Sequence, residues 1–384
     1  MSDTFENVDQ EIVSEAAQDG NTAVVTNKEK RKYFAKTGWR IALVGLIIQL
    51  FEFAFVIPIQ LINHGQFFLK NSWIQYPVIF ICVNCIGFPL AYLLFKKVEK
   101  TEIEKKKLKF GWLIVLLFIS FGITMVGNFL GMAVNAVILL PFGINPTAGN
   151  ALTNLMGSSN PINIILGIIV AGIGAPIFEE LIFRKLLIDH SLKYGAGASI
   201  LLSGLFFGLY HGNFGQFFYA FILGVIFSYV YINTGNIKNT IMLHMGINLY
   251  STAILIPSMS LIKPDFIEKL GAAVQLMQQG DFQAYLDAAV PLVTNDPGSL
   301  IGIYLMAAAV IFEYSMIFAG FILALCFIKR FININKAMPH GTKGTKRAAV
   351  FNWGSLLMIG LCSAIFVYFY LSQIIPAIVT KFVK

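Results

Sequence analysis

Long apolar runs constrain this chain more than any other feature, because a helix needs about 20 apolar residues to cross a bilayer. Charged residues make up only 12% of the sequence, about half the proportion found in soluble domains. The sequence therefore predicts an all-α, polytopic membrane helical bundle with about nine transmembrane helices. The expected spans cover approximately residues 39–62, 73–95, 110–140, 162–189, 196–211, 215–232, 238–257, 300–328 and 350–376. The fifth of these runs is short for a full span.

The distribution of basic residues predicts how the bundle is oriented. Lysine and arginine gather in segments 28–40, 96–109 and 329–349. Loops 63–72, 141–161 and 258–299 together hold only three basic residues, Lys70, Lys263 and Lys269. Because basic loops stay on the cytoplasmic side, we expect the N-terminus inside and the C-terminus outside. The net charge of +8 lies mostly in these loops, so we interpret it as membrane orientation and expect no nucleic-acid partner.

Composition divides the chain into five expected parts. They are a disordered cytoplasmic tail at 1–36, N-terminal transmembrane helices at 37–145, a core at 146–257, an extracytoplasmic amphipathic loop at 258–299 and C-terminal transmembrane helices at 300–384. The tail prediction rests on six acidic residues and no lysine or arginine among the first 27 residues, a composition typical of disorder. Within the amphipathic loop, helical spacing predicts an interfacial helix pair broken near Gly280. This pair could cap a site from outside, but we favour a passive surface loop.

Two adjacent carboxylates interrupt the fourth run. No charged side chain occurs from Ile162 to Phe178, and then Glu179, Glu180 and Arg184 follow. Each carboxylate in hydrocarbon costs about 2.5–3.5 kcal/mol on insertion scales, so such residues are functional candidates. On a helix Glu180 and Arg184 share a face, whereas Glu179 points about 100° away. We interpret Glu179 as a base held in place by the Glu180–Arg184 pair; the alternative is a structural ion pair with a carboxylate at the water interface.

Two of the five histidines, His211 and His244, fall within the apolar core downstream of the glutamates. His244 and Asn248 are four residues apart and share a helix face. A carboxylate and an imidazole around one water can deprotonate it for attack on a carbonyl. An imidazole and a carboxamide can donate hydrogen bonds to the resulting oxyanion. The alternative is that Glu179, His211 and His244 hold a divalent metal such as zinc with an open position, although their spacing is not H-E-x-x-H.

Three motifs in this order, Glu179-Glu180…Arg184, Phe207…His211 and His244…Asn248, resemble the CAAX prenyl endopeptidase and bacteriocin-processing family, also called CPBP or Abi, of intramembrane proteases. The resemblance covers roughly residues 160–256. It implies an all-helical, CAAX-protease-like catalytic core with the site in a cavity open toward water at depth. It also implies that Glu179 activates water, His211 helps to bind it, His244 and Asn248 form the oxyanion site, and Glu180 and Arg184 order the first motif. The family is described both as metallo- and as glutamate-dependent, so a metal is the weaker option.

From these residues and this resemblance we expect an integral membrane endopeptidase, in a bacterial plasma membrane, that cleaves a membrane-associated or lipidated peptide or protein. A non-catalytic protein of the same fold, acting in bacteriocin immunity or sensor regulation, is the alternative. A transporter that uses Glu179 as an ion relay is disfavoured because no internal repeat is present. Straight spans would place His211 near the outer end of its run and His244 near the inner end of another. For His211 and His244 to meet in one site, the helices that carry them must therefore be tilted and of unequal length.

Overall fold

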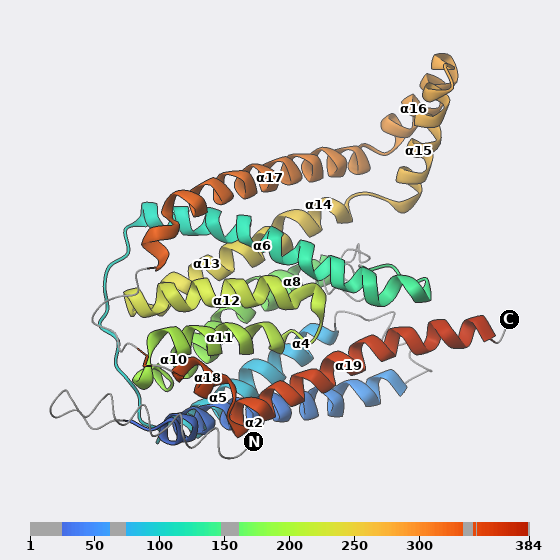
Figure 1. The fold of residues 1–384 in the computed structure, drawn as a ribbon. Coiled ribbons are helices and arrows are strands. Elements are labelled where there is room, and N and C mark those ends of the chain that lie inside the picture. Colours follow the sequence, from blue (N-terminus) through green and yellow to red (C-terminus); the bar gives the residue numbers. More distant parts are fainter. Residues whose placement is uncertain (1–24, 62–73, 147–160, 333–340, 343, 383–384) are drawn as a thin grey trace.

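The computed structural model describes residues 25–61, 74–146, 161–332, 341–342 and 344–382. Within these ranges every regular element is helical (Figure 1). The α-helices are α2 (Asn27–Leu61), α4 (Gln75–Phe80), α5 (Phe88–Phe95), α6 (Phe110–Leu139), α8 (Pro161–Gly167), α9 (Ala175–Glu180), α10 (Leu187–Asp189), α11 (Ala196–Tyr210), α12 (Phe214–Thr234), α13 (Ile237–Leu249), α14 (Ile256–Ser260), α15 (Pro264–Gln278), α16 (Phe282–Asn295), α17 (Pro297–Ile332), α18 (Thr345–Val350) and α19 (Trp353–Phe382). The first 24 residues of the predicted tail, the connection with Lys70 and part of the 329–349 segment lie outside the described residues.

Several of these helices run into one another through wider, π-helical turns. The π-helical segments are η3 (Ile81–Gly87) between α4 and α5, η5 (Ile168–Gly174) between α8 and α9, η6 (Leu181–Leu186) between α9 and α10, and η8 (Tyr250–Leu255) between α13 and α14. Short 3₁₀ turns are η4 (Leu140–Phe142) and η7 (Leu192–Tyr194). π-helical turns are rare and frequently occur at functional sites.

Among the described residues, eight helical stretches are long and apolar enough to cross a membrane. They are Asn27–Phe55, Tyr76–Phe95, Phe110–Phe142, Pro161–Asp189, Phe214–Thr234, Ile237–Ser260, Pro297–Phe327 and Trp353–Thr380. These correspond to eight of the nine predicted spans, and the prediction of an all-α polytopic bundle is confirmed. The remaining one, predicted over 196–211, is the shorter apolar helix α11.

The first helix begins earlier than the predicted span, which started at residue 39. Thr26 and Glu29 form a capping box: the Glu29 N–H donates to Thr26 Oγ1 at 3.3 Å, and the Thr26 N–H donates to Glu29 Oε2 at 2.9 Å. This arrangement satisfies backbone donors that a helix start otherwise leaves unpaired, so the helix extends through the basic segment. The Lys30 ammonium then donates to Thr342 Oγ1 at 2.6 Å, which brings the 28–40 and 329–349 segments to the same end of the bundle.

The helices that form the site pack in sequence across the bundle, with α17 on α6, α6 on α12 and α12 on α11 (Figure 1). Glycines permit this close packing, as is common between membrane helices. A Cβ added to Gly224 of α12 would lie 2.8 Å from the Gly204 Cα of α11, and one added to Gly127 of α6 would lie 2.3 Å from the Tyr219 Cα of α12. On the opposite side of the bundle, α19 packs along α2.

The short helix α11 allows His211 to lie at the same depth as His244, which straight, full-length spans would not. Its 15 residues reach about 22 Å at the usual rise, whereas the hydrocarbon core is about 30 Å thick. In Figure 1 the turn between α11 and α12 stops short of the far ends of α6 and α19. Gly212, with φ +70°, and Asn213, whose Oδ1 accepts from the Gln216 N–H, make this turn. His211, at the end of α11, therefore lies within the bundle.

The predicted helix pair in the 258–299 loop is present as α15 and α16, which project from one end of the bundle (Figure 1). Gly280 separates them with φ +86°, a conformation that residues with a Cβ rarely adopt. Large apolar side chains, including Ile267, Met277 and Phe282, stay exposed on this hairpin. That exposure fits the amphipathic character predicted from the sequence.

Candidate active site

A cavity of about 610 Å³ lies between α6, α9, the end of α11, α12, α13–η8 and α17. Glu179, His211, His244 and Asn248 all line it. Glu180 and Arg184 lie behind this wall, fully buried. The structure thus brings four predicted site residues to one cavity and sets the other two in the protein interior. Among the described residues, none of those lining the cavity belongs to the α15–α16 hairpin.

The ion pair of the first motif is enclosed on all sides. The Arg184 Nε lies 3.1 Å from Glu180 Oε2, and both side chains have no exposed surface. The orientation does not meet hydrogen-bond geometry, so none of the guanidinium nitrogens has a hydrogen-bond partner among the described residues. The guanidinium instead lies 4.3 Å from the centre of the Phe207 ring and 5.5 Å from that of Phe227. Glu180 and two aromatic faces therefore stabilise this buried charge.

His244 links the two glutamates. Its Nδ1 lies 3.0 Å from Glu180 Oε1, and its Nε2 lies 3.7 Å from Glu179 Oε2. A carboxylate oxygen accepts, so Nδ1 carries the proton of the shorter contact and Nε2 faces Glu179. The Glu179 side chain keeps 15% of its surface exposed, in contrast to the fully buried Glu180. The sequence predicted the Glu180–Arg184 pairing but not that His244 would share Glu180.

His211 lines the cavity, and one of its ring nitrogens is already hydrogen-bonded to the backbone. Its Nδ1 lies 2.8 Å from the Phe207 carbonyl oxygen, and a carbonyl can only accept. In the neutral imidazole the proton is therefore on Nδ1, and Nε2 offers a lone pair. This nitrogen can accept a hydrogen bond from a water in the cavity.

Phe207 organises the site more than its place in a motif suggested. Its ring lies edge-on to His211 at 5.0 Å and to His244 at 5.6 Å between centroids, and Arg184 lies over its face. Its carbonyl also holds the Nδ1 of His211. One buried aromatic residue thus packs against both histidines and the guanidinium, which fixes their relative positions.

Pro176 explains the position of Asn248. The Ala175 N–H donates to the Val170 carbonyl, so the next carbonyl in this five-residue register, that of Ala171, faces a proline without an N–H. The Asn248 amide fills the gap, donating from Nδ2 to the Ala171 oxygen at 2.9 Å. A carboxamide carries two N–H groups, so one is left for the cavity. This hydrogen bond joins the helix of the glutamates to that of His244.

Sequence reasoning missed one charged residue of the cavity, Glu313 of α17. It is the only acidic or basic residue from Pro297 to Phe327, and it lines the cavity with Tyr250. The Tyr250 hydroxyl lies 3.1 Å from Glu313 Oε2 and 2.9 Å from the Ala309 carbonyl oxygen. The signal in the sequence was a carboxylate within an apolar run, the feature that also drew attention to Glu179 and Glu180.

The arrangement does not fit a bound zinc ion. Among the described residues, no three His, Cys, Asp or Glu side chains are grouped to hold a metal. His244 Nε2 and Glu179 Oε2 lie 3.7 Å apart, a separation that two zinc ligands at about 2 Å can have, but in the described part of the chain no third such side chain is grouped with them. The reaction proposed below therefore uses only side chains of this protein and a water molecule.

Fold and cavity define a polytopic integral membrane protein in which polar side chains from separate helices meet inside the bundle. Residues 161–250 match the family model described as Type II CAAX prenyl endopeptidase Rce1-like. This segment, from α8 to the first residue of η8, contains all six candidate site residues. This part of the chain is therefore similar to CAAX-type intramembrane proteases, and the match covers less than half of the sequence. No curated protein and no solved structure matches the chain.

Proposed function

We propose that this protein hydrolyses a peptide bond in a membrane-associated or lipidated peptide by means of a water that Glu179 activates. The proposal rests on one observation: Glu179, His211, His244 and Asn248, from three separate helices, line a single cavity within the bundle. A carboxylate and an imidazole with a free lone pair are both groups that can act in general-base catalysis.

In the proposed reaction, water binds between the Glu179 carboxylate and Nε2 of His211. Glu179 takes a proton as the water oxygen bonds to the carbonyl carbon, and the carbonyl π electrons move to its oxygen. Protonated His244, through Nε2, and the second amide N–H of Asn248 donate to this oxyanion. The C–N bond then breaks, and the Glu179 carboxyl returns the proton to the leaving amine. Glu180 and Arg184 act as positioning residues, because Glu180 orients the His244 ring.

The test compares the membrane peptidome of cells that carry wild type, Glu179→Gln or His211→Ala. Loss of a general base costs about 10²–10⁴-fold in rate, so products of the wild type should fall by that factor in Glu179→Gln. They should also fall in His211→Ala, because the water loses the nitrogen that binds it. Glu268→Gln, on the exposed surface of α15, is the matched carboxylate-to-amide control and should leave the products unchanged. Undiminished processing in both site variants would refute the proposal.

Two further arms separate the alternatives. Activity that survives a chelator supports the glutamate mechanism, whereas loss on chelation and recovery with zinc would replace it by a metal mechanism. If the site variants keep an immunity or sensor phenotype, the non-catalytic role in bacteriocin immunity or sensor regulation is favoured instead.

For the topology we propose a cytoplasmic N-terminus in a bacterial plasma membrane. The contact between Lys30 and Thr342 supports it, because two basic segments then share one side. Thiol labelling of a single cysteine in place of Thr342 should succeed only after the membrane is permeabilised. Labelling of intact cells would reverse the orientation.

A further inference from the structure

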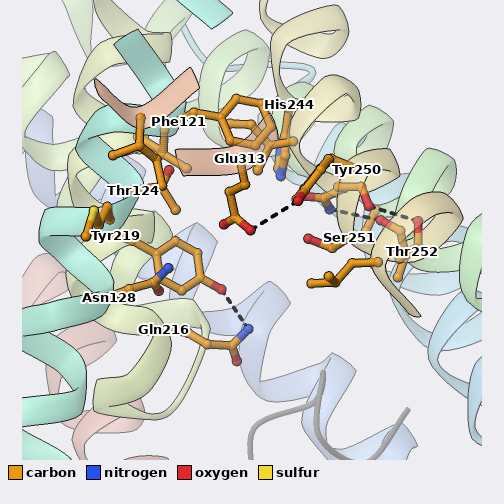
Figure 2. A pocket seen from close by; sticks show the side chains of 18 of the residues that line it. Phe121, Thr124, Asn128, Gln216, Tyr219, His244, Tyr250, Ser251, Thr252 and Glu313 are labelled. Carbon is orange, nitrogen blue, oxygen red and sulfur yellow. Dashed lines mark hydrogen bonds between the residues drawn. The ribbon is translucent and has the colours of Figure 1, made fainter. Parts of the chain in front are cut away.

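Glu313 enters the cavity from α17, a helix outside the segment that matches the family. Figure 2 shows its side chain extending into the cavity toward the hydroxyl of Tyr250. That tyrosine lies two residues after Asn248, so the carboxylate is close in the fold to the helix that carries part of the proposed oxyanion site. The substrate chain that reaches one group would therefore pass near the other.

The cavity offers Glu313 only partial compensation for its charge. Tyr250 has a single hydroxyl proton, and both the Ala309 carbonyl and Glu313 lie within reach of it. Among the described residues, no lysine, arginine or histidine forms an ion pair with Glu313. The described cavity wall contains two carboxyl groups, those of Glu179 and Glu313, and no lysine or arginine.

A carboxylate in an apolar span is costly and is usually paired or directed at a functional partner. The described wall holds no lysine or arginine, and His244 faces Glu179 and Glu180 instead of Glu313. The group that completes the Glu313 site is therefore one that the ligand brings. Ammonium and guanidinium groups donate charge-assisted hydrogen bonds to carboxylates, and these are stronger than bonds between neutral groups.

We propose that Glu313 binds a lysine or arginine side chain of the substrate, so that the cavity selects peptides with a basic residue near the cleaved bond. The assignment of this cation as part of a substrate rests on the proposed function. Tyr250 is a positioning residue in this site, because its hydroxyl orients the Glu313 carboxylate.

The test measures binding of myristoylated pentapeptide amides to the full-length protein in detergent. The peptides differ only at the central residue, which is lysine, arginine, norleucine or glutamate. A charge-assisted hydrogen bond contributes about 1.5–3 kcal/mol, so wild type should bind the lysine peptide at least about tenfold more tightly than the norleucine peptide. Glu313→Gln keeps the shape and should reduce this preference to less than about threefold. Glu313→Lys should favour the glutamate peptide.

Two controls keep the result specific. Glu268→Gln, on the exposed surface of α15, should keep the full preference. Tyr250→Phe leaves the carboxylate in place and should weaken the preference without reversing it. Equal binding of the lysine and norleucine peptides by wild type, absence of binding of the lysine peptide, or an unchanged preference in Glu313→Gln would each overturn the proposal.

The same peptides separate this proposal from the proposed reaction. If wild type binds the lysine peptide selectively but hydrolyses none of the set, the cation site stands and the proposed hydrolysis of such peptides fails. If hydrolysis depends on Glu179 but shows no dependence on charge at the central residue, the proposed reaction stands and the role of Glu313 falls.

Discussion

Removing one partner of the buried Glu180–Arg184 pair should destabilise the protein strongly. Arg184→Met retains most of the apolar volume but leaves the Glu180 carboxylate with His244 alone, in a site with no exposed surface. Breaking a buried pair from one side costs about 3–5 kcal/mol, because the remaining charge is uncompensated. The equilibrium constant for unfolding should therefore rise by about two to four powers of ten.

The assay is reversible unfolding in mixed micelles, monitored for Arg184→Met, Glu180→Gln and the double variant. Since the double variant leaves no isolated charge at this pair, its loss of stability should be well below the sum of the two single losses. The matched control is Asp265–Lys269 on α15, which has the same four-residue spacing and a separation of 3.0 Å but is largely exposed. Lys269→Met should change stability far less, because water screens that pair. A loss in Arg184→Met no larger than in Lys269→Met would refute the reasoning.

Two further predictions concern how the backbone holds the site. Asn248→Ala leaves the Ala171 carbonyl without its donor and should cost about 1–3 kcal/mol; adding Pro176→Ala, which restores an N–H, should recover part of the stability but not the hydrolysis. Equal stability of the single and double variants would contradict the inference that Asn248 replaces the N–H that Pro176 lacks. Gly224→Ala places a methyl 2.8 Å from the backbone of α11 and should cost about 1–3 kcal/mol through overpacking, with a drop in activity as His211 moves. Gly271→Ala, which meets nothing within 4 Å, is the control, and a melting temperature that responds equally to both changes would rule out the packing argument.

Residues whose role depends on local spacing could be predicted from the sequence. The four-residue spacing of Glu180 and Arg184 predicted their pairing, because it places both side chains on one face of a helix. The long apolar runs predicted the membrane spans, because charged residues are costly in hydrocarbon. Contacts between distant segments could not be predicted in the same way. The bond from Asn248 to Ala171 joins residues 77 positions apart, and nothing in either segment specifies the other.

The depth of His211 shows why boundaries matter in such a protein. The apolar run at 196–211 predicts a span from composition, yet α11 ends where Gly212 turns the chain. The sequence predicts the break between the runs at 196–211 and 215–232, but it does not show how deep in the bundle this turn lies. Glu313, in contrast, was visible in the sequence as a single charge in the run at 300–328. It was missed because no second polar residue at helical spacing drew attention to it.

Glu179 and Glu180 are adjacent in the sequence, yet Glu179 faces the cavity and Glu180 faces the protein interior. Neighbours on a helix point about 100° apart, so a pair of consecutive acids can serve a wet cavity with one side chain and the interior with the other. Exposure differs accordingly, at 15% for Glu179 and zero for Glu180. An imidazole has two nitrogens on opposite sides of its ring, and His244 uses one toward each acid. A pair of glutamates separated by four residues would face the same way, and one histidine could not then join the buried charge to the cavity.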